Sequence, residues 1–223
     1  GTDKISMGPS LDLSTLDSSQ GLLIQGLAVD DQAGASVSAA GDVNGDGFSD
    51  IIIGASGADS DGNTDNGASY VVFGREKSSS SSIDLTTLDG SNGFKVTGVG
   101  SYDYSGSQVS HAGDFNGDGY SDLLISAPNK TVSGQDKAGE AYVLYGKGSG
   151  FAPTISLSSI TEQSGFVISG NDAYDSFGAG ISSAGDLNQD GYSDLVIGAS
   201  GVDVDGSSNQ GQATIIYGHD ERL

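Results

Sequence analysis

The sequence contains three copies of one acidic nine-residue segment whose side-chain oxygens could bind a metal ion. They begin at Asp42, Asp114 and Asp186, and each places side-chain oxygens at positions 1, 3, 5 and 9 and a glycine at position 6. Such a loop wraps its oxygens around a hard cation such as calcium. The alternative is an Asx-rich turn without metal. Three carboxylates within nine residues repel one another unless a cation lies between them, so the threefold recurrence favours the cation.

The spacing of these segments shows that the chain is a repeat protein. They start at residues 42, 114 and 186, so the period is 72 residues, and apolar segments elsewhere keep the same period. A fixed period of this kind indicates that each unit is one supersecondary module stacked on its neighbours. We expect one repeat domain over 1–223, with repeat 1 at about 11–82, repeat 2 at about 83–154 and repeat 3 at about 155–223.

Each repeat is expected to contain four short strands, A to D. In the first copy they are Ala35–Ala39 (A), Asp50–Gly54 (B), Ser69–Phe73 (C) and Gly93–Gly98 (D). β-Branched and aromatic residues bounded by Gly, Asn, Asp and Ser are typical of strands. Strand B is apolar throughout, which predicts burial on both faces. Four-stranded units of this kind indicate an all-β fold built from β-propeller blades.

The charge of the chain excludes several classes of partner. The 223 residues include 8 Lys and Arg and 30 Asp and Glu, giving a net charge of −22. This acidity argues against nucleic acid, whose phosphates select basic surfaces, and against adsorption to anionic membranes. No stretch approaches the ~20 apolar residues that span a bilayer, so membrane insertion is not expected. The chain has no cysteine, so bound metal is the stabilising link available to a secreted protein of this kind.

Residues for catalysis are scarce. The two histidines, His111 and His219, are not at equivalent repeat positions, and no cysteine nucleophile exists. No Ser/His/Asp grouping suggests a nucleophile activated by a base. The chain is therefore not expected to be an enzyme.

The third repeat carries a recognisable motif. Phe177-Gly178-Ala179 leads into Ala184-Gly185-Asp186, the acidic loop and strand B. This arrangement resembles the FG-GAP repeat, which builds the propeller head of integrin alpha chains and occurs in many bacterial surface proteins. The first two repeats have Ala33-Gly34 and Ser105-Gly106 in place of Phe-Gly. The resemblance covers essentially the whole chain and implies a calcium-binding extracellular or cell-surface module that functions in adhesion by binding protein or carbohydrate.

The resemblance also implies three structural calcium ions, one inside each turn between strands A and B. The ligands would be the side chains at positions 1, 3, 5 and 9 and the main-chain carbonyl at position 7. The expected ligands are Asp42, Asn44, Asp46, Phe48 and Asp50; Asp114, Asn116, Asp118, Tyr120 and Asp122; and Asp186, Asn188, Asp190, Tyr192 and Asp194.

Strand alternation places the A–B and C–D loops at one end of each blade and the D–A and B–C loops at the other. Loops on a rigid scaffold often carry binding sites, and tyrosine beside carboxylates suits a protein or sugar partner. The alternative is a solvated acidic rim. The D–A loops contribute Asp30, Asp31, Tyr102, Asp103, Tyr104, Asp172, Tyr174 and Asp175, and the B–C loops contribute Asp59, Asp61, Asn63, Asp65, Asp203, Asp205 and Asn209. We interpret Asp59–Asp65 as a polar loop rather than a further calcium site.

Three repeats do not close an ordinary propeller, which has ~4–8 blades. The first strand is of type D, at Gly21–Gly26, and the last is of type C, at Thr214–Gly218. We expect self-association through this N-terminal D strand, since an unpaired sheet edge invites a partner. Two copies joined head to tail would form a six-bladed ring, and the same contact without closure would give a filament, as in a structural subunit of an extracellular array. Further repeats of a longer parent protein would complete the ring equally well, and such a parent could be a secreted hydrolase with a propeller part.

Overall fold

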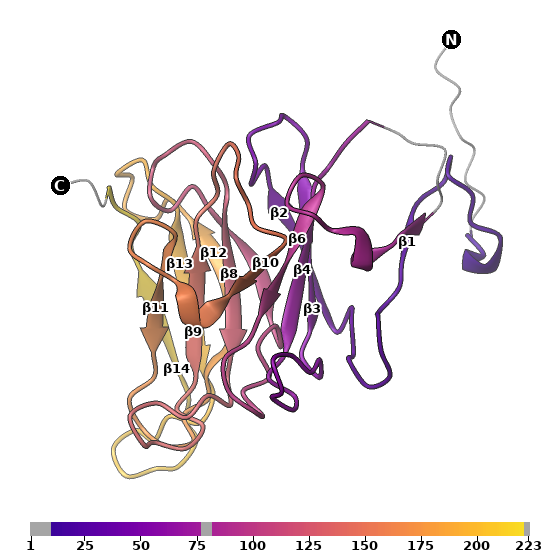
Figure 1. The fold of residues 1–223 in the computed structure, drawn as a ribbon. Coiled ribbons are helices and arrows are strands. Elements are labelled where there is room, and N and C mark those ends of the chain that lie inside the picture. The colour runs from indigo at the N-terminus through magenta and orange to yellow at the C-terminus, as the bar shows by residue number, and fades with distance from the viewer. Residues whose placement is uncertain (1–9, 77–81, 221–223) are drawn as a thin grey trace.

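The computed structural model describes residues 10–76 and 82–220 (Figure 1). Helical structure there consists of 3₁₀ turns, and no helix is long and apolar enough to cross a bilayer. These turns are η1 (Leu13–Thr15), η2 (Leu85–Thr87) and η3 (Leu157–Ser159). The strands are β1 (Leu23–Ile24), β2 (Ser36–Gly41), β3 (Asp50–Ala55), β4 (Ala68–Val72), β5 (Ser82–Ile83), β6 (Gly93–Thr97), β7 (Val109–Gly113), β8 (Asp122–Ala127), β9 (Glu140–Leu144), β10 (Thr154–Ser156), β11 (Gly165–Ser169), β12 (Phe177–Gly185), β13 (Asp194–Ala199) and β14 (Gln212–Ile216).

The main strands form three antiparallel blades. Blade 1 is β2-β3-β4-β6, blade 2 is β7-β8-β9-β11, and blade 3 is β12-β13-β14. Figure 1 shows them side by side, from blade 1 in violet to blade 3 in orange and yellow. The predicted all-β propeller-blade fold is therefore confirmed, and the row of blades is not closed. Among the described residues, blade 3 has no D strand, whereas the leading D strand, β1, lies outside the three blades.

Two short strands join neighbouring units, and neither was expected from the sequence. Along the chain, β10 comes after the C strand and before the D strand of blade 2. In space, it pairs in parallel with β6 of blade 1. β5 makes the equivalent parallel pairing with β1. The hydrogen bond from the Lys95 N–H to the Pro153 carbonyl, at 2.9 Å, belongs to this junction. Each connection therefore adds a parallel strand to the outer edge of the preceding D strand.

The apolar core lies between blades. The side chains of Val43, Ile52 and Val71 in blade 1 pack in the same cluster as Leu123 and Ile125 in blade 2. A second cluster joins blades 2 and 3 in the same way. Leu123 and Leu124 are adjacent in β8 and point to opposite faces, and both are 0 % exposed. The prediction that strand B is buried on both faces is thus confirmed for the central blade.

Candidate metal centres in the turns between strands A and B

Each acidic loop is a tight turn between the first two strands of its blade. The glycines at position 6 have positive φ angles: 89° at Gly47, 91° at Gly119 and 96° at Gly191. Side chains rarely adopt this left-handed conformation, so glycine suits the position. Position 4 is also left-handed in all three turns. Two left-handed residues within three positions curl the backbone, so the side chains at positions 1, 3 and 5 gather around one turn.

The carboxylates of the first turn point inward and accept backbone hydrogen bonds. The Gly47 N–H donates to Asp42 Oδ2 at 2.9 Å, and the Asp46 N–H donates to Asp42 Oδ1 at 3.0 Å. The Phe48 N–H donates to Asp46 Oδ1 at 2.9 Å. The third turn repeats these contacts through Asp186 and Asp190. The Asp46 N–H also donates to Asn44 Oδ1 at 3.0 Å, and Asn44 Nδ2 donates to Asp46 Oδ2 at 2.8 Å, so the predicted side chains at positions 1, 3 and 5 are linked through one turn.

The second turn leaves one carboxylate oxygen unsatisfied. Asp114 Oδ1 is buried and has no hydrogen-bond partner, whereas Asp42 and Asp186 each use the matching oxygen to accept an N–H. A buried acceptor without a partner loses its hydration and gains nothing in return. A cation beside this oxygen would remove that cost. Carboxylate, amide and carbonyl oxygens are the donors that calcium prefers, so the residues present fit this ion.

Carboxylates alone do not make a complete site. Within residues 10–76 and 82–220, no group of three His, Cys, Asp or Glu side chains is arranged to hold a metal by itself. A calcium ion in one of these turns would therefore also need the amide oxygen at position 3 and the carbonyl at position 7. Calcium takes 6–8 oxygen ligands of mixed type, so such a shell is ordinary for this ion.

The aspartate at position 9 makes contacts beyond its own turn that its place in the sequence does not reveal. Asp122 is 0 % exposed, and its Oδ2 accepts from the Phe115 N–H at 2.9 Å. Its Oδ1 accepts from the Gly146 N–H, also at 2.9 Å, just beyond strand C. Asp50 and Asp194 make the same two bonds in their own blades. The carboxylate therefore links the acidic turn to the end of strand C.

Burial raises the pKa of two of these carboxyl groups, those of Asp122 and Asp50. For Asp122 the pKa rises to about 7, because loss of hydration outweighs the two N–H donors that lower it, and the Asp118 charge raises it further. Burial also raises the pKa of Asp50, with smaller contributions from the charges of Asp46 and Asp42. Such a buried charge is costly, and a neighbouring cation is one way to offset that cost.

Successive acidic turns contact one another. The Ser121 N–H donates to the Asp42 carbonyl at 3.1 Å, and the Asp42 N–H donates to Ser121 Oγ at 3.1 Å. The Ser193 N–H makes the first of these bonds to the Asp114 carbonyl. The position-7 ring of Tyr120 lies against Gly45, where an added Cβ would overlap it. The turns therefore form a continuous row along one end of the blades.

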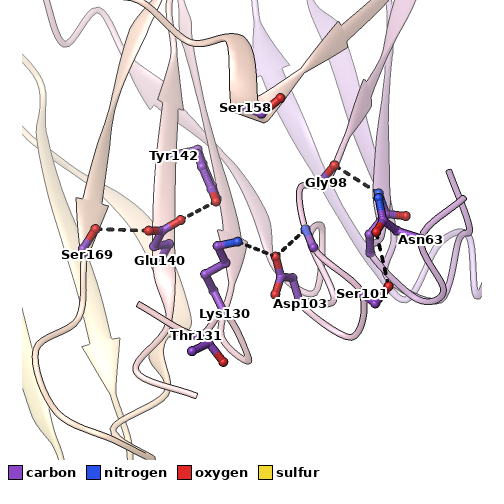
Figure 2. A network of polar contacts seen from close by, with 12 residues as sticks. Asn63, Gly98, Ser101, Asp103, Lys130, Thr131, Glu140, Tyr142, Ser158 and Ser169 are labelled. Atoms are coloured by element: carbon purple, nitrogen blue, oxygen red, sulfur yellow. Dashed lines mark hydrogen bonds and ion pairs between the residues drawn. The ribbon is translucent and has the colours of Figure 1, made fainter. Parts of the chain in front are cut away.

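The opposite end carries the predicted binding face, and Figure 2 shows part of it. Asp103 is only 6 % exposed and accepts from Lys130 Nζ at 2.9 Å and from the Gly100 N–H at 2.7 Å. Glu140 accepts from the Tyr142 hydroxyl and from Ser169 Oγ. Asp103 therefore helps to hold two loops together rather than forming part of an open acidic rim.

Other members of the predicted face are accessible. Tyr102 is 57 % exposed and Tyr174 is 61 % exposed. A cavity of about 400 Å³ in blade 3 is lined by Asp172, Tyr174, Asp175 and their neighbours in the B–C loop. Burial, followed by the charge of Asp172, raises the pKa of Asp175. This end thus combines exposed tyrosines with carboxylates, while Asp31 and Asp103 lie buried.

Known proteins share these repeats. The chain is 28% identical to integrin alpha-V of Gallus gallus over 73% of its length and 30% identical to integrin alpha-IIb of Mus musculus over 72%. It is 29% identical to a phosphatidylinositol-glycan-specific phospholipase D of Dictyostelium discoideum over 82% of its length. The chain spans only 14% of each integrin and 19% of the phospholipase.

The family model of the FG-GAP repeat matches residues 33–72, 105–144 and 177–216. Each match begins at strand A of a blade or a few residues before it and ends at strand C, so it contains one complete acidic turn. With three matched repeats, each folded as an integrin-like propeller blade, the chain belongs to the FG-GAP repeat family.

Proposed function

We propose that this chain is a calcium-stabilised, integrin-like propeller module that acts outside the cell or at its surface by binding protein or carbohydrate. The observation that carries the proposal is the threefold acidic turn, with inward-pointing carboxylates and, in the second copy, the unsatisfied oxygen of Asp114. The similarity to integrin alpha chains supports the extracellular setting and the role in adhesion.

Calcium bound in these turns would stabilise the fold rather than take part in a reaction. The fifteen residues named above would hold three ions, and each ion would neutralise carboxylates that otherwise repel one another. The position-9 aspartate links each turn to strand C of its blade. Ser121 and Ser193 link the second and third turns to the turn before each of them. An ion bound in one turn would therefore stabilise its own blade and the junction beside it, and its binding free energy would add to the stability of the fold.

The ligand-binding surface would lie at the other end of the blades. Tyr102 and Tyr174 occupy equivalent places in successive D–A loops, and both are exposed beside carboxylates. Tyrosine provides a large apolar surface with one hydrogen-bonding group, which suits protein and carbohydrate partners. The turns stiffened by calcium would keep these loops in place without contacting the ligand.

Isothermal titration calorimetry with calcium at neutral pH tests the metal sites. Three ions per chain are expected, and Asp46→Ala should remove one of them, because Asp46 is exposed and belongs to the first turn alone. Asp61→Ala is the matched control, since Asp61 is an exposed aspartate in a B–C loop. Absence of calcium binding, or equal losses in both variants, would refute the assignment. A glycan and protein array probed with wild type and with a Tyr102→Ala/Tyr174→Ala double variant tests the binding face.

A second candidate is the propeller part of a secreted hydrolase, favoured by the phospholipase D similarity over 82% of the chain. In that case the reaction would take place elsewhere in the protein. We assign no catalytic residue to this chain, and His111 and His219 are both exposed and belong to different blades. A phosphodiesterase and glycosidase assay of the chain should show no turnover, and robust turnover would contradict the binding role.

A further inference from the structure

A series of hydrogen bonds joins the position-9 aspartate of the second acidic turn to that of the first. Asp122 Oδ1 accepts from the Gly146 N–H at 2.9 Å, and the next residue, Lys147, donates its N–H to the Val43 carbonyl at 2.9 Å. The Val43 N–H donates to Asp50 Oδ2 at 2.8 Å. Val43 is position 2 of the first turn, between two proposed calcium ligands. The series therefore ends at residues that would surround an ion.

The same series continues from the second turn to the third. Asp194 Oδ1 accepts from the Gly218 N–H at 3.0 Å, and the next residue, His219, donates its N–H to the Phe115 carbonyl at 3.1 Å. The Phe115 N–H donates to Asp122 Oδ2 at 2.9 Å. Asp122 thus uses Oδ1 toward the first turn and Oδ2 toward the third. Continuous networks of hydrogen-bonded groups of this kind can carry energetic coupling between sites.

Position 8 of each later turn makes a second set of contacts with the turn before it. Ser121 lies between the proposed ligands at positions 7 and 9 of the second turn. Its N–H donates to the Asp42 carbonyl and its Oγ accepts from the Asp42 N–H, both at 3.1 Å. The Ser193 N–H donates to the Asp114 carbonyl at 3.1 Å. Asp42 and Asp114 are at position 1, so each later turn fixes the main chain at the first ligand of its neighbour.

We propose that the three turns bind calcium cooperatively, because each bound ion orders the turn beside it through these bonds. The inference rests on the calcium sites proposed above and concerns how they act on one another. Without ions, the carboxylates of a turn repel one another and favour looser conformations. An ion that orders the second turn would hold positions 1 and 2 of the first turn in place, so less conformational entropy remains to be lost when the first turn binds its ion. Linkage makes the effect reciprocal, so both turns gain affinity by the same factor.

The electrostatic effect of binding has the opposite sign. Each calcium ion that binds makes the net charge of −22 less negative and so weakens the attraction for the next ion. Turns that acted independently on this acidic chain would therefore fill with falling affinity. Turns joined by the hydrogen bonds described above would fill together. Positive cooperativity is thus a property that the bonds supply and the charge does not.

Native mass spectrometry during a calcium titration tests the coupling by counting the ions on each chain. At half-saturation, coupled turns should give mainly chains with no ion and chains with three, whereas independent turns give mainly chains with one and with two. Asp118→Ala removes the central site and should leave two turns that bind independently. Asp190→Ala removes the last site and should leave two adjacent turns that still bind cooperatively; Asp118 and Asp190 are both exposed.

The outcomes of this titration separate the coupling from the metal sites themselves. Absence of bound calcium in wild type would overturn the proposed sites, and the coupling with them. Three ions bound in the proportions of independent sites would overturn the coupling alone and leave the calcium-stabilised fold in place. Equal cooperativity in Asp118→Ala and Asp190→Ala would also overturn it, because the first and third turns share no hydrogen bond among the described residues.

Lys147→Pro tests one bond of the series without changing a proposed ligand, because proline has no N–H to donate to the Val43 carbonyl. Three ions should still bind, but the first turn should bind its ion about fivefold or more weakly. Lys147→Ala is the matched control, since it keeps the N–H and removes only the side chain over the Phe151 ring. Arg75→Pro is a second control, because Arg75 has the same repeat position in blade 1 and its N–H bonds to no acidic turn in the described residues. Equal weakening in either control would overturn the role of this bond.

Hydrogen exchange followed by NMR tests the mechanism without counting ions. In Asp46→Ala the first turn is expected to hold no ion, yet calcium should still slow exchange of the Asp42 amide about fivefold or more. The reason is that this N–H donates to Ser121 Oγ in the second turn, which the ion orders. Adding Ser121→Ala to the same variant should abolish the slowing. Asp42 exchange that calcium leaves unchanged in Asp46→Ala would overturn the coupling, even if wild type binds three ions.

Discussion

Asp122 offers a direct test of how the acidic turns contribute to stability. Its two carboxylate oxygens accept from the N–H groups of Phe115 and Gly146, both at 2.9 Å, and the side chain is fully buried. Asp122→Asn keeps the shape but replaces one acceptor by an NH₂ group. One buried N–H then loses its partner, which costs about 1–3 kcal/mol. That is a large part of the ~5–15 kcal/mol that stabilises a typical domain.

Asp118→Asn is the matched comparison in the same turn. Asp118 is exposed, and in the part of the chain that the structure describes its oxygens bond only to the Tyr120 N–H and the Asn116 side chain within the turn. Without calcium this variant should change the free energy of unfolding by about 0.5 kcal/mol or less. With calcium both variants should lose stability, since each removes one charge from the proposed metal shell.

Urea unfolding followed by circular dichroism, with chelator and with calcium, separates the two effects. We expect a large difference between the variants in chelator and a smaller one in calcium. Equal destabilisation of Asp122→Asn and Asp118→Asn in chelator would refute the structural link to strand C. If Asp122→Asn lost stability only when calcium is present, the aspartate at position 9 would act through the metal alone.

Three further predictions concern other parts of the molecule. A chelator should lower the melting temperature at low salt more than at high salt, because the metal-free chain of charge −22 repels itself; calorimetry at both salt concentrations measures this. Gly117→Ala should destabilise the fold by about 1–3 kcal/mol, since φ is 72° and an added Cβ overlaps the Tyr192 ring; unchanged urea unfolding would contradict it. Lys130→Met should cost about 1–3 kcal/mol by removing the cation paired with buried Asp103, and Lys130→Arg should recover part of that loss in the same assay.

The strands were predictable because their signals are local. Strands B and C are mainly apolar runs, whereas strands A and D alternate apolar with polar residues; glycines and polar turns bound them, and their positions recur with the 72-residue period. β5 and β10 were missed because they are two and three residues long and owe their conformation to pairing with β1 and β6. No pattern within so short a segment indicates a partner about 60 residues away.

The acidic turns were predictable as turns, but their wider contacts were not. The Asp122 carboxylate bonds to an N–H 24 residues further along the chain, and that neighbour is set by the pairing of β8 with β9. In the same way, the sequence places Asp103 on the binding face or, as the alternative, in a solvated rim, yet the side chain is buried and paired with Lys130 from another loop. Sequence spacing shows which side chains lie in one turn, whereas burial depends on what packs against that turn.

The overlap between units through β5 and β10 has a consequence for how such a chain can change in length. Because each connection pairs with the D strand that precedes it, a 72-residue period shares strand pairing with its neighbour and is not a self-contained block. If exactly 72 residues are removed or duplicated, the two ends that are joined occupy equivalent positions in the repeat. Each contact between neighbouring units is then formed again. A gain or loss of any other length that falls within a strand, a linking strand or an acidic turn would shift the register of that unit. Growth by whole periods is therefore the route open to this architecture, which accords with three repeats of equal length.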